Sequence, residues 1–77
     1  MTLYEFQKLD VAEQAAHLWY NGSFVSADVG TPATFYVLNE FFVEVVGDAG
    51  TFKAHALVPF RRGPRYERMV NHIELDL

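Results

Sequence analysis

Two neighbouring segments of this chain are apolar at almost every position, and this feature limits the folds open to it. Residues 33–38 read ATFYVL and residues 41–46 read FFVEVV. Successive side chains of a β-strand point to opposite faces of the sheet, so such strands are apolar on both faces. An antiparallel sheet covered on one face alternates between apolar and polar residues instead. The sequence therefore predicts strands whose two faces are both shielded from water.

Helical signals precede the strand region. The segments 2–5 (TLYE) and 10–13 (DVAE) both place a capping side chain three residues before a carboxylate. This spacing predicts a helical turn over residues 3–8 and a second helix from residue 11 to about residue 20. Asn21-Gly22 ends the second helix, which we attribute to the left-handed conformation that both residues tolerate.

A further helix is expected at the C-terminal end, where Gly63-Pro64 supplies a proline for the first helical position. Its residues at i, i+3, i+4 and i+7 are apolar and form one stripe: Tyr66, Met69, Val70 and Ile73. The helix after residue 11 has a comparable stripe: Val11, Ala15, Leu18 and Trp19. Both stripes are expected to pack on the sheet.

Between the helices the hydrophobic period changes to two. The expected strands are 23–27, 33–38, 41–46 and 51–60, joined by short turns. Short connections favour an antiparallel meander. The expected fold is therefore a single α+β domain over residues 1–77, with a four-stranded meander between an N-terminal helix in two parts and a C-terminal helix.

A register for the last two strands follows if Val46 faces Thr51. Glu44 then pairs with Lys53 on one face of the sheet, which is a favourable opposite-charge pair. On the other face the expected pairs are Val45 with Phe52, Val43 with Ala54, and Phe41 with Ala56. Pro59 cannot donate to a strand ladder, which predicts that the last strand is an edge.

One face of the sheet remains apolar after this assignment. It carries Phe35, Val37, Phe42, Val46 and Leu57, with His55 beside Phe42. Either the helices cover opposite faces of the sheet within one chain, or both helices cover one face and another molecule covers the second. We favour the second arrangement, because large apolar patches mark interfaces. It predicts a small protein-interaction module that forms a homodimer or binds another protein.

The size of the chain supports self-association. Ordering 77 residues costs about 115 kcal/mol at roughly 1.5 kcal/mol per residue. Burial of about 4,800 Å² of apolar surface contributes about 120 kcal/mol. Because the two terms nearly cancel, burying further apolar surface against a second copy would stabilise the fold.

Charge is unevenly distributed along the chain. Residues 1–52 hold one base and seven acids, whereas residues 53–77 hold five bases and three acids. The second part contains a basic segment: Arg61, Arg62, Arg65 and Arg68. An arginine in the first turn of a helix is unfavourable, because its positive charge opposes the helix dipole. A nearby anion or carboxylate would offset this cost. An alternative function is thus binding of an anion or of single-stranded nucleic acid.

Other functional classes find little support in the sequence. There is no cysteine, no HExxH motif, and no phosphate-binding glycine loop or nucleophile elbow. The three histidines lie on three different expected elements. The net charge of −4 argues against general binding to nucleic acids or membrane surfaces. We expect no enzymatic activity and no cofactor or metal.

The N-terminal residues do not resemble a signal peptide and no apolar run could cross a membrane, so we expect a cytoplasmic protein.

The residues TLYEFQKLD at positions 2–10, EQA at 13–15, Trp19 and FFVEV at 41–45 together resemble a group of short bacterial proteins that begin TLYEFxxL. This similarity covers about the first 20 residues and one strand. It implies a similar order of helix and strands. The group has no known function, and the basic segment does not resemble its members.

Overall fold

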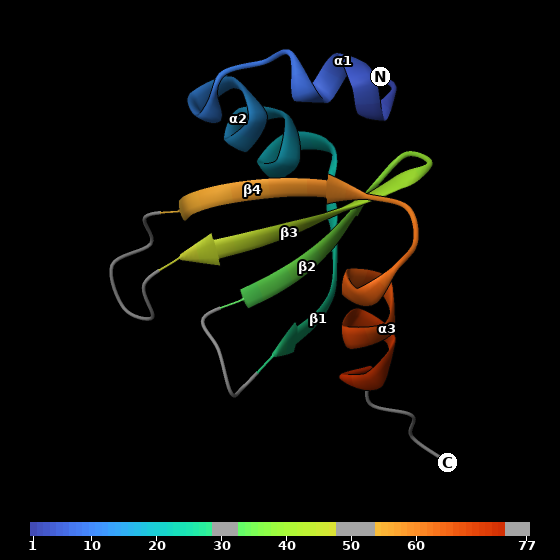
Figure 1. Ribbon diagram of the computed structural model, residues 1–77. Helices are drawn as coiled ribbons and strands as arrows, with labels where there is room; N and C mark the ends of the chain where they lie inside the picture. Colours follow the sequence, from blue (N-terminus) through green and yellow to red (C-terminus); the bar gives the residue numbers. More distant parts are fainter. Residues whose placement is uncertain (29–32, 48–53, 74–77) are drawn as a thin grey trace.

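The computed structural model describes residues 1–28, 33–47 and 54–73 and confirms the expected α+β fold (Figure 1). The four strands form one antiparallel sheet in the order β1-β2-β3-β4. The elements are α1 (Leu3–Gln7), α2 (Val11–Asn21), β1 (Ser23–Asp28), β2 (Ala33–Leu38), β3 (Phe41–Gly47), β4 (Ala54–Phe60) and α3 (Pro64–Asn71).

The N-terminal helices begin at the expected caps. In α1 the Thr2 hydroxyl accepts from the Glu5 backbone N–H at 3.1 Å, and the Glu5 carboxylate accepts from the Thr2 N–H at 2.9 Å. In α2 the Asp10 carboxylate accepts from the Glu13 N–H at 2.8 Å. Each bond satisfies an amide that has no partner inside its helix, which is why short helices start at these residues.

A two-residue turn joins β2 to β3. Asn39 occupies the left-handed region with a φ of 58°, a conformation that asparagine tolerates better than most residues. The tight turn fixes the register of this hairpin, in which Leu38 lies opposite Phe41 and Phe35 lies opposite Glu44.

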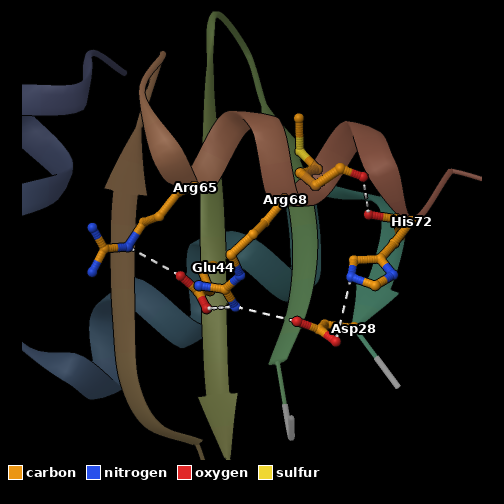
Figure 2. A network of polar contacts seen from close by, with 7 residues as sticks. Asp28, Glu44, Arg65, Arg68 and His72 are labelled. Atoms are coloured by element: carbon orange, nitrogen blue, oxygen red, sulfur yellow. Dashed lines mark hydrogen bonds and ion pairs between the residues drawn. The ribbon is translucent and has the colours of Figure 1, made fainter. Parts of the chain in front are cut away.

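The helices cover opposite faces of the sheet. Figure 2 shows α3 in front of the strands, with α1 and α2 behind them. Behind the sheet lies one buried cluster: Phe6, Leu18, Leu38, Phe41, Val43, Val45 and Leu57. In front of it lies a second: Phe35, Phe60 and Met69, with Val25 and Phe42 packed against them. The arrangement that we favoured from the sequence, with both helices on one face, is therefore wrong. The two-sided apolar strands are shielded by the chain's own two ends.

The register of β3 and β4 also differs from the expected one. Val45 pairs with Leu57, and Ala56 pairs with Val46 instead of Phe41. The shift along β3 is five residues, and an odd shift exchanges the faces of the strand. It moves Leu57 into the cluster behind the sheet. Glu44 lies opposite Val58, while Thr51, Phe52 and Lys53 lie outside the described residues.

Gly22 ends α2 for a different reason from the expected one. Its φ is −83°, which is an extended and not a left-handed conformation. A Cβ atom at this position would lie 2.6 Å from the carbonyl oxygen of Leu18 and 2.9 Å from a carbon of the Leu18 side chain. Glycine is needed because the chain turns into β1 directly against the last turn of α2.

We expect Gly22→Ala to lower the free energy of unfolding by about 1–3 kcal/mol, because the added methyl group must displace the buried Leu18 or the backbone. Urea denaturation would measure the loss. Ser23→Ala is the control: Ser23 is exposed, so this change should alter stability by less than about 0.5 kcal/mol. Equal stability of wild type and Gly22→Ala would show that the close approach has no energetic role.

The capping box makes the start of α1 sensitive to pH. The hydrogen bond from the Thr2 N–H is the largest of the effects that lower the pKa of Glu5 below its ordinary value of 4.5. Because the folded pKa is the lower one, the carboxylate contributes fully above the unfolded pKa, and the contribution is lost as the pH falls through the folded value. We expect the Thr2 amide resonance to titrate with a midpoint below pH 4.5, and not to titrate in Glu5→Gln.

Candidate functional site

A buried carboxylate lies at the centre of the sheet face that α3 covers. Glu44 projects from β3, and its side chain is 5% exposed. Arg65 donates from Nε to Glu44 Oε1 at 3.0 Å, and Arg68 donates from Nη2 to Oε2 at 2.9 Å (Figure 2). Each carboxylate oxygen thus binds one guanidinium group of α3. A buried carboxylate requires such compensation, since an unpaired charge is strongly destabilising there.

The contacts continue to the edge strand β1. The same Arg68 nitrogen lies 3.6 Å from Oδ2 of Asp28, and Nε2 of His72 lies 3.4 Å from Oδ1 (Figure 2). Arg68 also lies over the ring of Phe35, with 5.6 Å between its guanidinium carbon and the ring centroid. Ser26 donates its hydroxyl to the Met69 carbonyl at 2.9 Å. These contacts hold α3 across β3, β2 and β1.

The network fixes α3 on the sheet through paired charges. Two arginines face two carboxylates, so their formal charges cancel when His72 is neutral. Asp28 and His72 form an acid–histidine pair, but the nearby Ser26 hydroxyl is buried and bound to a carbonyl.

The basic segment is divided by the structure. Arg65 and Arg68 face Glu44, so of the two expected ways to resolve the conflict with the helix dipole, an anion or a carboxylate, the structure contains the carboxylate. Arg61 and Arg62 are exposed at the start of the turn to α3 and form no ion pair with another described residue. The structure thus divides the four arginines into a pair that binds Glu44 and a pair that is exposed before α3.

The residues expected at an interface do not share one free face. Leu57 lies on the opposite face, in the cluster with Val45. Phe35 is fully buried beneath α3, and Phe42 contacts the ring of Tyr66 at 5.7 Å between centroids. The remaining members are the half-buried Val37 and Val46, and His55, whose side chain lies outside the described residues.

The two histidines whose side chains the structure describes belong to different helices. His17 is half-buried on α2, and His72 contacts Asp28 from the end of α3. Among the described residues there is no group of three or more potential ligands that could hold a metal ion. Within the same residues, no helix combines the length and the apolar character needed to cross a bilayer.

A second surface surrounds β1, and we call it the β1 surface. On one face of the strand are exposed aromatic residues of α2 and β1, and on the other are exposed apolar residues in the last turn of α3 and just after it. Its members are Trp19 (59% exposed), Tyr20 (88%), Phe24 (62%), Val70 (42%) and Ile73 (37%). The half-buried Tyr36 holds Trp19 and Phe24 edge-on, with centroid distances of 5.8 and 6.0 Å.

We did not anticipate this surface from the sequence, because its residues fall on the two stripes assigned to the core. Of the α3 stripe only Met69 is buried, and of the α2 stripe only Leu18 is buried. The run WYNGSF at residues 19–24 carries the one available signal. It places three large aromatic residues around a turn that leads into a strand.

No protein-family model, no curated protein and no solved structure matches this chain. Its function must therefore be inferred from its own residues.

Removing the two arginines should destabilise the protein more than removing the charge of Glu44. Replacing Arg65 and Arg68 together by Met should destabilise the protein by about 3–5 kcal/mol, because Glu44 is left buried without a counter-charge. Glu44→Gln should cost only about 1 kcal/mol, since the two arginines are each more than 40% exposed and can be hydrated. Urea denaturation measures both changes.

The matched control replaces Arg61 and Arg62 by Met. It removes the same number of positive charges from exposed positions and should change stability by less than about 0.5 kcal/mol. Equal losses of stability in the two double variants would mean that the loss of positive charge causes the effect. The buried Glu44 carboxylate without a counter-charge would then not be its cause.

Proposed function

We propose that this chain is a small non-enzymatic protein-interaction module that binds its partner along the free edge of β1. The observation that supports this most is the difference between the two edges of the sheet. β4 contains Pro59, which has no N–H to donate to a further strand. β1 reads SFVSAD, without proline or lysine, and pairs only with β2 among the described strands.

An open strand edge normally carries features that prevent association. Lysine, proline, bulges and covering segments are the common ones, because unpaired N–H and C=O groups accept a further strand. β1 has a bulge between Phe24 and Ser26, it ends in the charged Asp28, and α3 packs against one of its faces, but it contains neither lysine nor proline. Against these features stand the exposed apolar side chains of the β1 surface, of which Phe24 lies on the strand itself and Trp19 contacts the same Tyr36 ring as Phe24. Exposed apolar surface next to an open edge is the pattern used by modules that add a partner's strand to their own sheet.

The side chains are suited to a protein partner. Tryptophan and tyrosine are the residues that most often dominate binding energy at protein interfaces, because each contributes a large rigid area. The contacts of Trp19 and Phe24 with Tyr36 fix two of these rings before binding, which lowers the entropy cost of association. The bulge limits the number of backbone hydrogen bonds, so these side chains must provide most of the affinity.

Photo-crosslinking tests this function. With p-benzoylphenylalanine in place of Phe24, irradiation in the native host cells should give a covalent adduct with a protein, identified by mass spectrometry. The same group in place of Tyr4, which is 70% exposed on α1 but lies outside the β1 surface, serves as the control. If position 24 gives no more adduct than position 4, the β1 surface does not bind a protein and the proposed function is wrong.

A further inference from the structure

We infer that the strand which joins β1 is the β1 strand of a second copy of this chain, related to the first by a two-fold axis perpendicular to the sheet. The inference rests on the proposed function and specifies its partner. The product is a continuous sheet of eight strands in which the two β1 strands run antiparallel at the centre. Such an interface uses the same surface on both molecules, as two-fold dimers require.

The aromatic face of β1 is complementary to itself in this arrangement. A two-fold axis perpendicular to the sheet keeps equivalent faces of the two sheets on the same side. Phe24 pairs with Tyr36, and Ala27 pairs with Thr34, two residues away on β2, so Phe24 and Ala27 share a face. In the register that pairs Ser23 with Asp28 of the second copy, the exposed Phe24 ring lies opposite the small Ala27 of that copy. By symmetry, Phe24 of the second copy lies opposite Ala27 of the first copy.

The second face supplies apolar surface at the same joint. The C-terminal part of α3 is fixed to β1 by the bond from Ser26 to the Met69 carbonyl and by the contact of His72 with Asp28. The two-fold axis therefore brings the C-terminal turns of two α3 helices next to each other. Val70 and Ile73, which are exposed in one chain, become buried between them. This gives a reason for the apolar stripe of α3 that the sheet does not cover.

The charges allow an antiparallel and disfavour a parallel arrangement. Asp28, the last residue of β1, is its only charged residue. Antiparallel pairing places the two Asp28 carboxylates at opposite ends of the joint. At about 3.4 Å per residue they are roughly 17 Å apart, beyond the Debye length of about 8 Å at physiological salt. Parallel pairing in register would place the two carboxylates side by side.

The exposed aromatic side chains supply somewhat more than half of the area that a specific dimer buries. At 150–250 Å² per aromatic side chain, the exposed fractions of Trp19, Tyr20 and Phe24 amount to roughly 450 Å². A standard interface buries about 800 Å² on each partner. Val70, Ile73 and the backbone of the open edge add to the aromatic area. A second copy therefore fits the β1 surface in size as well as in symmetry.

Sedimentation velocity of the purified protein from about 1 to 200 µM tests this pairing. The wild type should reach the mass of a dimer within this range. Phe24→Asp should raise the dissociation constant about 100-fold or more, because a two-fold interface carries each substitution twice. Phe24 is exposed, so the variant should fold, which circular dichroism would verify. Tyr4→Asp, which adds the same charge outside the β1 surface, should leave the dimer intact.

Hydrogen exchange provides a second readout. The amides of β1 should be protected in the concentrated wild type and exchange faster in Phe24→Asp, while those of β3 stay unchanged. A wild type that is monomeric up to 200 µM, or a dimer that Phe24→Asp leaves intact, overturns the pairing. If the monomeric protein still crosslinks to another protein from position 24, the interaction module remains and only the identity of its partner is wrong.

Discussion

The arrangement of the whole chain depends on a carboxylate inside an apolar sheet face. Glu44 lies between Phe35 on β2 and Val58 on β4, where it cannot be hydrated well. Only α3 among the described elements brings cations to it, through Arg65 and Arg68. The need to compensate Glu44 therefore places α3 on this face. Buried ion pairs often contribute little net stability compared with apolar residues, so we interpret this one as fixing where α3 packs.

The sequence predicts the elements well and the last strand pairing poorly. Caps, turn residues and hydrophobic periods are local signals, and the helix and strand boundaries follow them closely. The register of β3 and β4 depends on a choice between distant partners. Lys53 and the arginines of α3 are all candidate counter-charges for Glu44, and the sequence does not rank them. The observed register also places Leu57 in the buried cluster, a gain that only the three-dimensional packing reveals.

The candidate surface was missed for a related reason. A helical apolar stripe normally marks a buried face, but α3 spans only Pro64–Asn71 and places one apolar side chain, Met69, in the core. Its inner side also carries Tyr66, which contacts Phe42, and two arginines and His72, whose long stems and rings cover apolar surface while their polar ends bind carboxylates. The helix is thereby rotated away from the orientation that its apolar stripe predicts. Val70 and Ile73 remain exposed as a consequence.

The position of α3 also links the buried network around Glu44 to the edge strand β1. Because Arg68 and His72 reach Asp28 while Ser26 binds the Met69 carbonyl, β1 is held on one face by α3. On the other face Tyr36 holds Trp19 and Phe24. An edge strand with free ends would lose much of its conformational freedom on pairing, whereas one fixed on both faces loses less. In the proposed pairing, the residues that fasten the three layers of a single chain therefore also lower the entropy cost of adding another strand to β1.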